Sequence, residues 1–278
     1  MRDNKKRLGA KNTEDDAAPP TQIAPGLNFV VPTEFVELPS RGKLYPSNHP
    51  LHNQEVIEIK QMTAKEEDIL TSESLIKNGV VLHRFVESVI VDENVDPLSI
   101  LSCDRNAIVV WSRIYGYGPE YDTQFECPSC GKKEKASFDL REIIESRGLP
   151  ELDLEEEELS ENGNLIITLP ITNWKIECKM LNGYSEKEAA AKEKRGGKND
   201  AVASSQMKMI IKSIGGHEDK HIISRAIEAM PAKDALHLRL KYQKFYPTLE
   251  LKHDFTCNDC GFSQEVDVPI TSDFFWIK

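Results

Sequence analysis

A chain of 278 residues is long enough to bury a sizeable core in one or two domains. Hydrophobic residues make up 39% and charged residues 29%, and no apolar run approaches the roughly 20 residues that span a bilayer, so a membrane protein is not expected. The formal net charge of −11 argues against general nucleic-acid binding, which needs a basic surface facing phosphates.

The N-terminal stretch, residues 1–26, is predicted to be disordered. Residues 1–16 mix charges with almost no apolar side chains, and residues 17–26 are rich in proline and alanine. Ordered structure is expected from Leu27. Strand-like sequence at 35–38, a loop punctuated by proline and glycine, and an alternating strand at 55–62 then predict a β-hairpin.

Helical patterns fill the next stretch of the chain. Thr63 and Glu66 have the spacing of a capping box, which predicts a helix through Leu70. A second helix is expected over residues 72–91, where Gly79 marks either a close contact or a break. A third is expected to start at Asp96-Pro97, a cap followed by proline, and to end near residue 116.

Two short cysteine pairs, each followed by glycine and here called the first and the second cysteine knuckle, lie between runs of strand-like sequence. Cys127 and Cys130 follow an expected strand at 121–126, and Cys257 and Cys260 follow one at 248–255. The two-residue gap lets both sulfurs of a pair face one ion, and the glycine tolerates the positive φ that turns backbone N–H groups toward the thiolates. The two pairs together supply the four sulfurs of a closed tetrahedral zinc site, one ion per chain.

The pairs are far apart in the sequence, with 126 residues between Cys130 and Cys257. A local zinc ribbon separates its halves by about 15–20 residues, so one shared ion would join the C-terminal end to the middle of the chain. A zinc tetrathiolate carries −2 and would take the net charge from −11 to −13. Disulfides, a redox pair and free thiols are the alternatives. A polar N-terminus without a signal peptide, and strands on both sides of each pair, weigh against the first two.

The remaining cysteines and the region between the pairs carry weaker signals. Cys103 and Cys178 lack partners at ligand spacing and are predicted to be small buried side chains. Six carboxylates among residues 151–158 indicate a solvated face, with a metal or a basic partner as the alternative. The pattern predicts helices at 139–147, 185–194, 201–214, 219–230 and 232–245, a hairpin over 165–169 and 174–180, and a flexible break at 195–200.

One motif suggests catalysis and is rejected. Residues 217–221 match H-E-x-x-H, in which two histidines on a helix bind zinc. Gly215-Gly216 directly precedes His217, so the segment reads as a loop entering a helix, and no third ligand follows His221 at short spacing. Phosphate-binding loops, nucleophile elbows and kinase signatures are absent from the sequence, so enzyme activity is not expected.

A set of short motifs occurs along the chain in a fixed order. They are Val36–Gly42 with Tyr45-Pro46, Met62–Leu70 with Leu75–Gly79, Asp104-Arg105, Tyr115-Gly116, the first cysteine knuckle, Pro231–Asp234, Leu238-Arg239, the second knuckle and Phe274–Trp276. In this order they resemble the baseplate proteins of T-even-type contractile-tailed bacteriophages, specifically the group of the baseplate hub assembly protein. The resemblance covers most of residues 35–278, and residues 1–26 and 185–200 look like additions outside it.

The sequence therefore predicts an α+β fold, with a helical body, short antiparallel β-hairpins and a split four-cysteine zinc-ribbon-like module. The expected regions are a disordered tail at 1–26, a hairpin and helical region at 27–120, the first knuckle hairpin at 121–140, an inserted α+β region at 141–247 with a flexible segment at 185–200, and the second knuckle with the C-terminal strands at 248–278.

The resemblance implies a structural or assembly role in the phage tail baseplate, through contacts with other baseplate or hub proteins. Such a protein would lie in the virion tail or, during assembly, in the host cytoplasm, without a nucleic-acid, membrane or small-molecule partner. A zinc-ribbon regulator that binds a polymerase or nucleic acid is the alternative. The candidates for partner contacts are Arg41 and Tyr45 in the first loop, which could also be an ordinary turn, and Phe274, Phe275 and Trp276, which could also plug the core.

Overall fold

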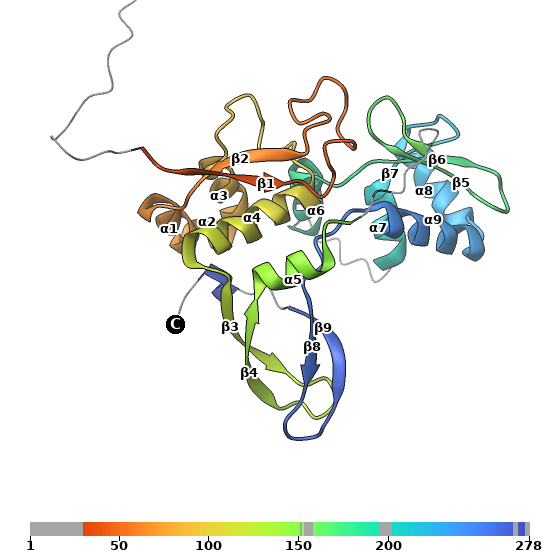
Figure 1. Ribbon diagram of the computed structural model, residues 1–278. Helices are drawn as coiled ribbons and strands as arrows, with labels where there is room; N and C mark the ends of the chain where they lie inside the picture. The colour runs from red at the N-terminus through yellow and green to blue at the C-terminus, as the bar shows by residue number, and fades with distance from the viewer. Residues whose placement is uncertain (1–29, 151, 153–157, 195–201, 269–271, 276–278) are drawn as a thin grey trace, which may run out of the picture. The chain divides into compact units, whose positions relative to one another are not determined.

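The computed structural model describes residues 30–150, 152, 158–194, 202–268 and 272–275 (Figure 1). Helices and short antiparallel sheets alternate along this part of the chain, which confirms the α+β class. The chain divides into two units, residues 1–31 and 32–278, and every element described below belongs to the second. The predicted tail at 1–26, the flexible break at 195–200, most of the acidic run and Trp276 lie outside the described residues. The finer division into regions stays a prediction.

The first hairpin pairs β1 (Thr33–Glu37) with β2 (Val56–Lys60) in antiparallel register. Alternation places Val36, Ile57 and Ile59 in the core and leaves the other face of the hairpin to solvent. Helix α1 (Ala64–Thr71) follows, and both hydrogen bonds of the predicted capping box at its start are present. The structure therefore confirms both the predicted hairpin and the predicted capped helix.

The predicted helix at 72–91 is wrong as one element, because the chain breaks at Gly79. Helix α2 (Glu73–Asn78) ends there with Gly79 at φ +70°, and helix α3 (Val81–Val89) starts anew. The third helix also begins later than predicted. Asp96 closes a separate turn by accepting from the backbone N–H of Leu98, and α4 (Ser102–Tyr117) begins after it.

Two separate hairpins carry the cysteine knuckles. The first joins β3 (Glu120–Glu126) to β4 (Lys133–Asp139), and Asp139 then caps helix α5 (Leu140–Arg147). The second joins β8 (Lys252–Thr256) to β9 (Ser263–Asp267). The two hairpins lie side by side, with their cysteine turns at the same end (Figure 1). A short 3-10 helix (Ser272–Phe275) follows near the C-terminus.

The region between the knuckles is built on a three-stranded antiparallel sheet. Its strands are β5 (Leu165–Thr168), β6 (Lys175–Cys178) and β7 (Ile211–Ile214), in that order. The helices of this region are α6 (Gly183–Lys194), α7 (Val202–Ile210), α8 (Lys220–Ala229) and α9 (Ala232–Phe245). The predicted helix at 201–214 is wrong in its last turn, because Ile211–Ile214 instead completes the sheet beside β6, where its β-branched side chains are buried.

One apolar cluster runs through the hairpin, the helices and the three-stranded sheet. Cys103 and Cys178 lie inside it, as predicted, and burial raises the pKa of the Cys178 thiol to about 12. Asp234 of α9 fixes the turn between β5 and β6, because its carboxylate accepts from the backbone N–H groups of Ile171 and Thr172. Burial opposes ionisation of Asp234, but these hydrogen bonds outweigh it and lower the pKa of the carboxyl.

Candidate metal centre

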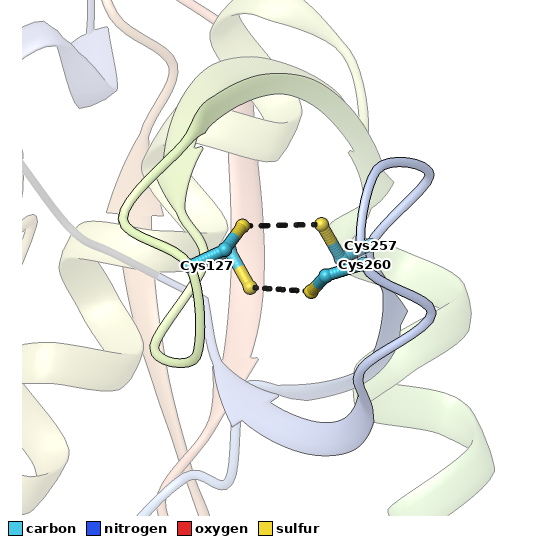
Figure 2. Close-up of side chains that lie close together, drawn as sticks. Cys127, Cys257 and Cys260 are labelled. Carbon is cyan, nitrogen blue, oxygen red and sulfur yellow. Dashed lines mark hydrogen bonds between the residues drawn. The ribbon is translucent and has the colours of Figure 1, made fainter.

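The four knuckle cysteines converge on one point between the two hairpins (Figure 2). The sulfurs of Cys127 and Cys260 are 3.7 Å apart, as are those of Cys130 and Cys257, and all four lie within 4.8 Å of one another. Sulfurs that bind one ion tetrahedrally at about 2.3 Å lie about 3.8 Å apart, whereas a disulfide brings them to about 2.05 Å. The spacing fits an ion held by four thiolates and does not fit disulfides.

Both knuckles use the same backbone turn. In the first, the N–H of Cys127 donates to Lys132 O at 2.8 Å, and the N–H of Gly131 donates to Cys127 O at 2.9 Å. The second knuckle makes the equivalent bonds, with Gly261 donating to Cys257 O at 3.0 Å. The two glycines have φ of +71° and +70°, a region that glycine enters without strain. The C-x-x-C-G sequence therefore presents each pair of sulfurs in the same way.

The turn also supplies donors that favour a thiolate. Burial opposes ionisation of Cys127, but the backbone N–H groups of Cys130 and Ser129 point to its sulfur, and its pKa falls to about 7. At Cys130 the N–H of Lys132 favours the thiolate, while burial and the neighbouring thiols raise the pKa overall. Thiolates are the ligands of soft metals, so these donors favour the form of Cys127 that binds an ion, and an ion would supply the positive charge that stabilises the other thiolates.

Contacts other than the sulfurs also join the two knuckle hairpins: the Phe138 ring meets His253 of β8 edge-on at 5.1 Å, and Arg147 of α5 pairs with Glu265 of β9. A small apolar cluster, separate from the main core, contains Cys127, Cys257, Phe255 and Val266, with Phe262 packed against it. At the surface, Lys132 Nζ and Asp259 Oδ1 form an ion pair at 2.5 Å, which contributes little because both groups face solvent. Modules with so few buried side chains commonly depend on a metal or a disulfide.

The C-terminal aromatic residues pack into the core. Phe274 and Phe275 are only 1% and 6% exposed. Phe274 meets Tyr121 of β3 edge-on at 5.1 Å between ring centroids, and Phe275 lies 5.2 Å from Phe85 of α3. In this conformation they are inaccessible to a partner, so the geometry supports the core-plug alternative.

A buried arginine, which the sequence analysis missed, joins helix α4 to the knuckle region. Arg113 donates through Nε to Phe274 O at 2.9 Å, through Nη1 to Gly118 O at 2.5 Å and through Nη2 to Glu120 O at 2.6 Å. One guanidinium thus binds the C-terminal segment, the end of α4 and the start of β3. The sequence signal that could have found it is a cation in a helical run, Ile108–Ile114, that is apolar apart from Ser112.

A buried carboxylate on helix α4 binds the loop between β1 and β2, which contains Arg41 and Tyr45. Asp104 of α4 accepts from the backbone N–H and hydroxyl of Ser40, at 2.9 and 2.6 Å, and from the Tyr45 hydroxyl at 2.8 Å. Burial raises the pKa of Asp104, against the effect of these donors. Tyr45 is 1% exposed, so its contacts are internal, whereas Arg41 is half-buried and stays a candidate for partner contact.

The histidines of the H-E-x-x-H match belong to a turn and a helix start. His217 lies in the turn after β7, and Asp219 caps α8 by accepting from the N–H of His221 and Ile222. Within the described residues, the knuckle cysteines are the one group of three or more metal-ligating side chains that gather closely enough to hold an ion. A membrane-spanning helix is likewise absent from the described part of the chain.

Comparison with known protein families identifies this chain's relationship. A family model described as T4 bacteriophage base plate protein matches residues 31–276. Neither the curated proteins nor the solved structures include a match to this chain. The matched segment contains both cysteine knuckles, the Asp104 loop and the C-terminal aromatic residues, and it confirms the resemblance to the T4-type base plate proteins.

Proposed function

This chain belongs to the T4 bacteriophage base plate protein family, and we propose that it acts at the base plate hub, as a component or as an assembly protein. The family places it among the structural proteins of the virion tail base plate. Its action there would be protein–protein contact with other base plate proteins, first in the host cytoplasm during assembly. The family match over 31–276 is the observation that supports a base plate role, and the order of the short motifs is what suggests the hub.

The four cysteines, in this proposal, bind one structural Zn²⁺ per chain. The 3.7 Å sulfur separations support a single tetrahedral ion, and four protein thiolates leave no open position for a substrate or a catalytic water. Thiolate ligands suit zinc, Cu(I) and iron–sulfur clusters, and zinc is the one of these without redox chemistry, as suits a purely structural ion. The ion would fix β8–β9 against β3–β4, close in sequence to Phe274, whose carbonyl accepts from Arg113 of α4.

The experiment is quantitative mass spectrometry of purified virions beside assembly intermediates from infected cells, together with zinc analysis of the purified protein. Detection in virions identifies a component, and detection only in intermediates identifies an assembly factor. Absence from both would refute the proposed role. We expect one zinc per chain in the wild type, loss of zinc in Cys257→Ser, and full zinc in the matched control Ser129→Ala, which changes the same module but no sulfur.

A further inference from the structure

An apolar groove runs between helices α7 and α9, away from the cysteine centre. The groove is open to solvent, and its volume is about 780 Å³, within the range of ligand-binding pockets. Met207, Ile210 and Tyr242 are among its buried and half-buried lining residues. On its α9 side, Leu236 and Leu240 are 49% and 57% exposed, one helical turn apart. A single exposed leucine is ordinary, but two leucines on adjacent turns of one helix, beside an apolar groove, form an apolar patch that a partner can bury.

The exposed charge of helix α9, which forms one side of this groove, is opposite in sign to the net charge of the whole chain. Arg239 is the single charged side chain among the described residues that line it. The exposed charged side chains of α9 are all basic, Lys233, Arg239 and Lys244, while its acidic residue, Asp234, is buried. In a protein with a net charge of −11, a basic and apolar surface favours an acidic partner.

We propose that the groove between α7 and α9 receives an amphipathic helix of another base plate protein, with a carboxylate facing Arg239. This inference rests on the proposed function and names the surface that would perform it. Leu236 and Leu240 stand at i and i+4, so a partner helix with apolar residues at i, i+3 or i+4 and i+7 can pack along them. Arg239 lies between them in sequence and is placed to pair with an acidic residue on the flank of that helix.

Two other occupants fit less well. A second copy meeting this face symmetrically would oppose the basic residues of α9 to themselves. The N-terminal stretch of this chain would make a poor helix for the groove, because residues 1–16 have almost no apolar side chains and Pro19, Pro20 and Pro25 interrupt the part that follows. Both remain outcomes that the experiment below distinguishes.

The test replaces exposed groove residues in the full-length protein during phage assembly. Leu240→Asp adds an acidic group to the patch, and Ile222→Asp is its matched control, since Ile222 is 46% exposed on α8 outside the groove. Arg239→Glu reverses the groove charge, and Arg225→Glu makes the same change at an exposed position of α8. All four substitutions are at exposed positions, so thermal unfolding should match the wild type within a few degrees.

We expect Leu240→Asp and Arg239→Glu to lower the amount of the protein in virions or assembly intermediates at least about tenfold, and the two controls to leave it unchanged. A photo-crosslinking amino acid at position 240 should join to a helical, acidic peptide of another base plate protein, and the same probe at position 222 should not. Equal incorporation of all variants, or crosslinks to a second copy or to residues 1–26, would overturn the groove assignment alone. If the wild type is absent from virions and intermediates, both the proposed function and this inference fail.

Discussion

Removing the proposed zinc ion should destabilise the whole protein, because the two cysteine pairs that would bind it are separated by 126 residues. In the unfolded chain, bringing the pairs together closes a loop of that length, which costs about 5 kcal/mol by the relation used for disulfide loops. In the folded protein β3–β4 and β8–β9 already hold the sulfurs 3.7 Å apart, so that cost is absent. An ion therefore binds the folded state in preference, and its loss should cost roughly 5 kcal/mol of the free energy of unfolding.

Thermal unfolding followed by circular dichroism measures this effect. At about 2–4 °C per kcal/mol for a protein of this size, we expect the Tm to fall roughly 10–20 °C in Cys257→Ser, and similarly in the wild type after chelation. Restoring zinc should recover the Tm of the wild type but not of the variant. Ser129→Ala should melt like the wild type.

Hydrogen exchange locates the effect in the chain. We expect the amides of β8 and β9 to lose protection first when zinc is removed, because the ion would join this hairpin to β3–β4 and only a small apolar cluster packs around its knuckle. The reasoning is refuted if Cys257→Ser keeps one zinc per chain and melts within about 2 °C of Ser129→Ala. A fall in Tm without any change in the exchange of β8 and β9 would also refute it.

Three further predictions concern the described core. Gly42→Ala should lower the free energy of unfolding by at least about 2 kcal/mol in denaturant, because its Cβ would lie 2.3 Å from a backbone nitrogen at a φ of +70°. Gly79→Ala is the control, since Gly79 has the same φ but open space around it, and it should cost about 1 kcal/mol. Equal losses in the two variants would contradict the clash at Gly42. Arg113→Met leaves three backbone carbonyls without their donor and should cost about 3–5 kcal/mol in the same assay, against less than about 0.5 for the exposed Arg84→Met. The folded-state pKa of Asp234 lies below its unfolded value, so its contribution is complete above about pH 4 and is lost as pH falls through the folded-state pKa; Asp234→Asn should weaken the acid dependence of unfolding, and an unchanged dependence would exclude this carboxyl as its source.

Much of the local structure could be predicted because short-range chemistry specifies it. The capping box of Thr63 and Glu66, the cap at Asp139 and the C-x-x-C-G turns each involve partners within a few residues, so spacing alone reveals them. One helix error arose where the competing interaction is distant, whereas the break at Gly79 and the turn at Asp96 are local. Ile211–Ile214 has an acceptable helical pattern, and it becomes a strand because β6 offers a partner edge that the sequence does not show.

The sequence by itself determined that two cysteine knuckles exist, what each can bind, and which family the chain resembles. Only the tertiary structure decided that the two pairs meet, that Phe274 and Phe275 are buried, and that Arg113 and Asp104 are internal connectors. The physical reason is distance along the chain. Whether residues more than a hundred positions apart meet depends on the packing of every element between them, while a turn or a cap depends on its immediate neighbours.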